Sequence, residues 1–301
     1  MNTDLSKTAE GAGPVARETK LRLGPVLGRV VFFWLVFGLW VLGSGKLASF
    51  APRAWQGFVC GVIGSIGTLG FTWWLLRRDG LGLQDAGLAW RRGSIARFMV
   101  GVFIGVGLFA GMAVINATFG GVRWVRSPEV GLTAVLMSAL TFLALGCLEE
   151  LGFRGYPLRM LERPMGVWGA QILVAAMFGF SHYIQGWPLL PALLGTGLGS
   201  LVFGMAAIAT RGLAVPIGIH AAGNLIDWML GGKGPSGFWK IVIAEESRSH
   251  SQLVSTLGYC IVMTAATAGF WLWHRRQKQS GEFSEFRIDS MTTYSKQRDR
   301  A

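Results

Sequence analysis

Charged residues are scarce in this sequence. Only 15% of the 301 residues are Asp, Glu, Lys or Arg, whereas 51% are hydrophobic, and the chain carries 44 glycines and 13 tryptophans. A soluble domain normally has about 25% charged residues with which to cover its surface. The composition therefore excludes a soluble protein and is typical of a membrane protein with several helices across the bilayer.

Disulfide and β-strand patterns are also missing. The three cysteines, Cys60, Cys147 and Cys260, lie in apolar runs, and no C-x-x-C or zinc-finger spacing occurs. An odd number of cysteines placed in this way predicts no disulfide framework. No segment alternates apolar and polar residues with a period of two, so the spanning elements are helices, because only helices and closed barrels cross lipid.

Long apolar runs are what the chain has instead. Most of them reach the ~17–25 residues that a helix needs to cross the hydrocarbon layer. The seventh is short and is interrupted by Pro216. We expect an all-α, polytopic membrane helix bundle of about eight transmembrane helices, at residues 30–49, 56–76, 98–118, 130–149, 166–184, 189–209, 213–230 and 252–273.

The basic residues are distributed unevenly between the two ends of these helices. Of the 28 Lys and Arg residues, 21 fall in the two tails and in every second connection, which would face one side of the membrane. Cytoplasmic segments carry such an excess, so we predict that both termini are cytoplasmic in a bacterial inner membrane. The net charge of +12 then indicates contact with the lipid bilayer and its anionic lipids, and no nucleic acid partner.

The chain divides into five parts on this interpretation. The segment at 77–97 alternates leucines and Trp90 with arginines, which predicts an interfacial amphipathic helix on the cytoplasmic leaflet. The parts are a cytoplasmic tail at 1–29, two helices plus the interfacial segment at 30–94, a core at 95–232, a loop and last helix at 233–273, and a basic cytoplasmic tail at 274–301.

The core contains charges at the end of an apolar helix. Glu149, Glu150 and Arg154 follow the uncharged run 132–148. A charge at bilayer depth costs roughly 2.5–3.5 kcal/mol on insertion scales and therefore indicates a functional site. Glu150 and Arg154 are four residues apart and share a helical face, whereas Glu149 is rotated by about 100°. We predict that Glu150 pairs with Arg154 and that Glu149 stays free for chemistry.

Two histidines also lie in apolar runs. Phe178 and His182 share one helical face, and His220 and Asn224 share another, with Asp227 three residues further on. Polar side chains at this depth should face the bundle interior and can converge there. A carboxylate, imidazoles and an amide are the groups that water-activated amide hydrolysis needs. The remaining histidines, at positions 250 and 274, are expected to be solvated.

These motifs together resemble the CPBP family, which covers CAAX proteases and bacteriocin-processing enzymes and is also called Abi or type II CAAX prenyl endopeptidases. The resemblance spans roughly residues 95–232. It rests on Glu149-Glu150-x-x-x-Arg154, Phe178-x-x-x-His182 and His220-x-x-x-Asn224, in this order on successive helices.

The resemblance implies a glutamic-type intramembrane endopeptidase. By this likeness Glu149 is the general base that activates water, assisted by His182, and His220 with Asn224 forms the oxyanion site. Glu150, Arg154 and Phe178 would support them. The implied substrate is a membrane-embedded or lipid-anchored peptide or protein, for instance one that is prenylated or bears a leader, and no cofactor is implied.

Three alternatives stay open at this point. Glu149, His182 and His220 would supply three ligands to a zinc ion with an open fourth position. Intramembrane Glu and His also build proton relays in transporters, and a non-enzymatic membrane scaffold would need no chemistry. We further expect the polar site to lie toward the cytoplasmic side, because Glu149 ends its span just before a basic loop at 154–163.

Overall fold

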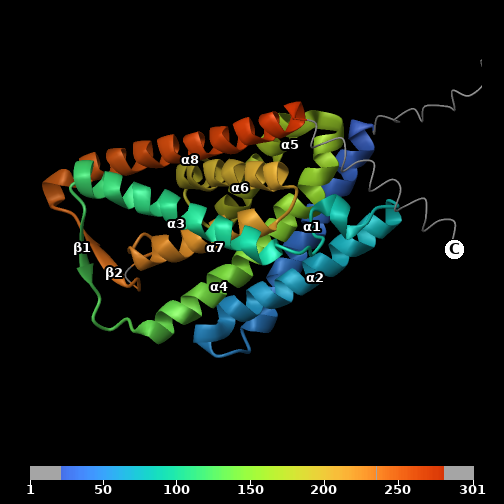
Figure 1. Ribbon diagram of the computed structural model, residues 1–301. Coiled ribbons are helices and arrows are strands. Elements are labelled where there is room, and N and C mark those ends of the chain that lie inside the picture. The colour runs from blue at the N-terminus through green and yellow to red at the C-terminus, as the bar shows by residue number, and fades with distance from the viewer. Residues whose placement is uncertain (1–21, 235, 281–301) are drawn as a thin grey trace, which may run out of the picture.

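The computed structural model describes residues 22–234 and 236–280, and within them the chain is a helix bundle (Figure 1). One α-helix occupies each of the eight predicted apolar runs. Their bounds are α1 Leu23–Ala48, α2 Gln56–Arg78, α3 Ser94–Phe119, α4 Leu132–Glu150, α5 Tyr156–Ile184, α6 Gly197–Thr210, α7 Ala214–Met229 and α8 Arg248–Gln279.

The number of membrane crossings differs from the prediction. Six helical segments of the described residues are long and apolar enough to cross a membrane, so a count of eight is not confirmed. α7 has only 16 residues. α4 and α5 form part of one 53-residue segment, Leu132–Ile184, joined by a π-helical turn at Leu151–Gly155.

The chain reverses inside α5. Gly166 has φ 70° and ψ 176°, a left-handed φ that L-residues with a side chain avoid, and Pro164 lies just before it. Residues 132–165 therefore form one helical arm that is about 50 Å long. Residues 167–184 form a second arm that runs back alongside the first. The rings of Phe153 and Phe178, one on each arm, meet at 5.0 Å.

A small sheet closes one end of the bundle. β1, Arg123–Arg126, pairs antiparallel with β2, Trp239–Val242, so that Trp124 lies opposite Ile241. The strands lie beside the end of α3 and the beginning of α8 (Figure 1). The start of α1 and the end of α8 lie together at the opposite end of the bundle.

The predicted amphipathic helix at 77–97 is wrong. Between the end of α2 at Arg78 and the start of α3 at Ser94, the structure forms only a four-residue 3₁₀ turn, Leu83–Ala86. Gly80, Gly87 and Gly93 all have positive φ values, which end any regular helix. The alternating leucines and arginines therefore belong to a series of turns, and these turns pack against the helix bundle.

α3 and α7 run parallel in close contact. A Cβ at Gly101 would collide with the carbonyl oxygen of Val215, and one at Gly105 would lie 2.6 Å from that of Ile219. Backbones approach this closely only where side chains are absent, as at helix interfaces in membranes. This contact sets the position of α7, which carries His220.

We predict that Gly101→Ala lowers stability by about 1–3 kcal/mol, because the added methyl group overpacks the α3–α7 contact. Gly107→Ala is the matched control, since a Cβ at Gly107 meets nothing within 4 Å. The melting temperature of both variants in one detergent is the measurement. Equal melting temperatures would contradict this account of the contact.

Candidate active site

The predicted carboxylate–guanidinium pair joins the last residue of α4, Glu150, to Arg154 in the π-helical turn. Arg154 donates to Glu150 Oε1 from Nη1 at 3.2 Å, and both side chains are fully buried. Arg154 also donates from Nη2 to Ser200 Oγ on α6 at 2.6 Å. Its guanidinium carbon stands 4.4 Å from the ring centre of Phe178 and 5.3 Å from that of Phe203. Such contacts compensate a buried cation in a low-dielectric site.

Glu150 connects this pair to α7. The same oxygen, Oε1, lies 2.8 Å from Nδ1 of His220, which is buried. A carboxylate oxygen accepts hydrogen bonds, so Nδ1 carries the proton. The ring of Phe203 stacks on the imidazole at 4.5 Å and an interplanar angle of 9°. The imidazole is therefore held in one orientation.

Nε2 of His220 points at Glu149. It lies 3.5 Å from Glu149 Oε2, an ion-pair distance. That oxygen is shielded from solvent and accepts no hydrogen bond from the described residues, although 30% of the Glu149 side chain remains exposed. A carboxylate that is partly buried without a donor is costly unless a substrate or water supplies one. Glu149 is thus the carboxylate that Arg154 does not pair with.

His182 approaches from the returning arm of α5. Its Nδ1 lies 2.9 Å from the backbone carbonyl of Phe178, and its ring packs between Phe178 at 4.6 Å and Trp187 at 5.4 Å. A carbonyl can only accept, so Nδ1 is the donor and Nε2 carries the lone pair. His182 therefore presents a proton acceptor.

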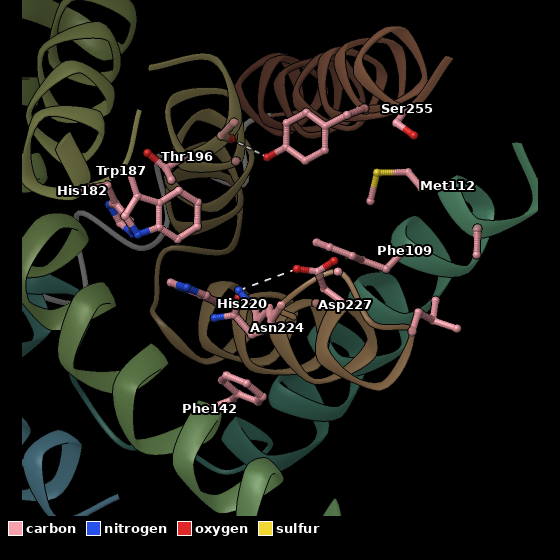
Figure 2. A pocket seen from close by; sticks show the side chains of 18 of the residues that line it. Phe109, Met112, Phe142, His182, Trp187, Thr196, His220, Asn224, Asp227 and Ser255 are labelled. Atoms are coloured by element: carbon pink, nitrogen blue, oxygen red, sulfur yellow. Dashed lines mark hydrogen bonds and ion pairs between the residues drawn. The ribbon is translucent and has the colours of Figure 1, made fainter. Parts of the chain in front are cut away.

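One cavity of about 530 Å³ brings the predicted residues together. Glu149, His182, His220 and Asn224 all line it. Figure 2 shows His220, Asn224 and Asp227 along α7 facing the space, with His182 and Trp187 across from them. The volume is that of a small-molecule or short-peptide pocket. It is bounded by α3, α4, α5, α6, α7, α8 and the two strands.

The structure corrects the predicted loop after Glu149. Residues 154–163 are helical and Arg154 is buried, so this stretch is no loop and Glu149 lies midway along the arm 132–165. The cavity reaches Trp124 and Ile241 in the two strands, at the end opposite the start of α1. The orientation of the termini is untested, so a site toward the cytoplasmic side stays a prediction.

Two further predictions concern the other histidines and a metal. His274 is only 1% exposed, so its prediction as solvated is wrong, whereas His250 is exposed.

Within residues 22–234 and 236–280, no group of three or more His, Cys, Asp or Glu side chains is placed to hold a metal ion. The set Glu149, His182 and His220 does not fit zinc in this geometry, and no step below runs through a metal.

Comparison with known proteins supports the predicted resemblance. Residues 131–226 match the family described as type II CAAX prenyl endopeptidase, Rce1-like. The match covers α4 to most of α7 and includes every predicted site residue. The matched stretch is 96 of the 301 residues and is similar to a family of prenyl endopeptidases. A search of curated proteins found no match.

We predict that Arg154→Met costs about 3–5 kcal/mol of stability, because it leaves the fully buried Glu150 without its cation. Ser200→Ala removes one hydrogen bond to the guanidinium and should cost about 1.5–3 kcal/mol. Thermal unfolding in detergent ranks the two variants. If Arg154→Met were as stable as the unmodified protein, the pair would not hold the site together.

Proposed function

We propose that this protein is an intramembrane endopeptidase that hydrolyses a peptide bond of a membrane-associated substrate with water activated by Glu149. The observation that carries the proposal is the Glu149 carboxylate, which faces the cavity without a hydrogen-bond donor on Oε2 while His220 stands 3.5 Å away. The match to an endopeptidase family supports the same reaction class.

The proposed oxyanion site needs a donor on each ring nitrogen of His220, which is an imidazolium. Glu149 and Glu150 carry two negative charges and Arg154 carries one positive charge, so a second positive charge on His220 makes the cluster neutral. A neutral, mutually paired cluster costs least in a low-dielectric site. An imidazolium held by Glu150 through Nδ1–H then offers Nε2–H as a second donor.

Each residue then has one role in hydrolysis. Glu149 removes a proton from water as the oxygen attacks the substrate carbonyl carbon, and the lone pair on His182 Nε2 orients that water. Nε2–H of His220 and the amide of Asn224 donate to the oxyanion that forms. Glu149 passes its proton to the leaving nitrogen as the C–N bond breaks, which yields a carboxylic acid and an amine.

Glu149→Gln tests the proposal because it keeps the shape of the side chain and removes the base. We expect cleavage of a quenched fluorescent peptide library by the detergent-purified protein to fall by about 10²–10⁴-fold. The melting temperature should stay close to that of the unmodified protein. Undiminished cleavage by a folded Glu149→Gln protein would rule out this role, and absence of cleavage by the unmodified protein would favour a scaffold.

His182→Ala tests the orientation of water. We expect kcat to fall by about 10²-fold, the cost of a misplaced reactant, with a smaller change in KM. His250→Ala is the matched control, because His250 is exposed and bonds to the carbonyl of Phe119, outside the cavity. Equal activity of the two variants would remove His182 from the mechanism.

A further inference from the structure

A second, smaller cavity lies at the end of the bundle remote from the two strands (Figure 1). The connection between α2 and α3 lines one side of it, and the connection between α6 and α7 lines the other. The N–H of Leu213 donates to the carbonyl oxygen of Gly87 at 3.3 Å, and a Cβ at Gly87 would lie 3.1 Å from the Cα of Gly212. The two connections are therefore docked on each other, and the cavity between them is part of the fold.

Three arginines from both connections line this cavity. They are Arg91 before α3, Arg97 in the first turn of α3, and Arg211 between α6 and α7. No Asp or Glu of the described chain belongs to the lining. Arg97 uses one N–H of its guanidinium on the carbonyl oxygen of Thr210 at 3.4 Å, and a guanidinium has five. Guanidinium groups match the geometry of anionic oxygens, so the lining favours an anion.

Uncharged donors add to the arginines. The hydroxyl oxygen of Ser94 accepts from the N–H of Arg91 at 3.0 Å, which leaves the hydroxyl hydrogen to donate elsewhere. α7 begins at Ala214 without a side-chain cap, and Ala214 and Val215 line the cavity. The first N–H groups of a helix have no acceptor inside it and favour an anion.

The backbone of Arg211 is unusual. Its φ of 52° is positive, and no other residue of the described chain except glycine has a positive φ. Arg211 ends α6 at a position that helices usually give to glycine or asparagine, because a side chain is disfavoured there. A residue kept in an unfavourable conformation is typical of ligand sites. We therefore take the side chain, and not the turn, as the reason for an arginine at this position.

The size and position of the cavity indicate which anion it takes. Its volume is about 40 Å³, and one water needs roughly 10–15 Å³, so it holds a single small group. Trp90, next to Arg91, is 79% exposed. Exposed tryptophans in membrane proteins lie at the level of the lipid headgroups, where the phosphates are. A phosphate group also has more oxygens to offer these donors than a carboxylate has.

We propose that this cavity binds a phosphate group, which a lipid headgroup or a soluble phosphate ion supplies. The bound group would join the start of α3 to the start of α7. The cavity shares no lining residue with the one that contains Glu149. The inference therefore goes beyond the proposed function and does not depend on it.

The experiment measures the melting temperature of the detergent-purified protein during titration with phosphatidylglycerol, phosphatidylcholine or inorganic phosphate. A ligand of the folded state raises this temperature, and the titration gives an apparent Kd. We expect phosphatidylglycerol or inorganic phosphate to stabilise the protein with saturation. Phosphatidylcholine, whose headgroup has no net charge, controls for lipid in general.

Two variants test the arginines. Arg97→Gln and Arg211→Gly should each raise the Kd about 10-fold or more, the effect of lost hydrogen bonds to a charged group. Without ligand, Arg211→Gly should melt no lower than the unmodified protein, because glycine adopts a positive φ freely. Arg92→Gln is the matched control, since Arg92 is exposed beside Arg91 but outside the lining.

The pattern across ligands and variants decides the inference. Stabilisation by phosphatidylglycerol that both variants weaken and Arg92→Gln does not supports the site, with a lipid as the source. The same pattern with inorganic phosphate alone supports it with a soluble source. No stabilisation by either, equal stabilisation by the two lipids, or equal weakening by Arg92→Gln overturns it. If Arg211→Gly melts lower without ligand, Arg97→Gln alone decides by the same criteria.

Discussion

The buried pair of Glu150 and Arg154 is the interaction on which the rest of the site depends. Both side chains are fully buried, so neither charge is tolerable without the other. Arg154 connects the pair to α6 through Ser200, and Glu150 connects it to α7 through His220. Three helices are therefore placed by two adjacent charges, and the direction of the His220 imidazole is a consequence of this arrangement.

The reversal at Gly166 explains how distant motifs meet. Glu149 lies 17 residues before Gly166 and His182 lies 16 residues after it, so a hairpin about that glycine returns His182 to the level of Glu149. A straight helix would have separated the two residues by the thickness of the membrane. The π-helical turn at Leu151–Gly155 lies between them and turns Arg154 inward.

Much of this could be predicted from the sequence, because the signals are local. Runs of apolar residues located the eight helices, and the four-residue spacing of Glu150 and Arg154 predicted that they could pair. The sequence predicted a reversal between the runs 130–149 and 166–184 but placed it in a loop at 154–163, whereas the chain stays helical there and turns at Gly166. That error also placed Glu149 at the end of a helix that in fact continues to residue 165.

Other site residues carry no local signal. Ser200 is one small residue in an apolar, glycine-rich run, and only its contact with Arg154 distinguishes it. From the sequence, Lys233 is a lysine in a loop. Only the packing of α4 against α7 brings it to Phe142 and Asp227. His274 follows an apolar run and precedes two arginines, so its burial depends on packing that the sequence does not display.

The most direct test of the account is whether peptide cleavage needs a metal. Purified protein would be assayed on a fluorescent peptide before and after treatment with a strong chelator, and its metal content measured by mass spectrometry. If Glu149 activates water together with the two histidines, the rate is unchanged by the chelator. A rate that is lost with the chelator and restored by zinc would contradict the account and make these side chains ligands.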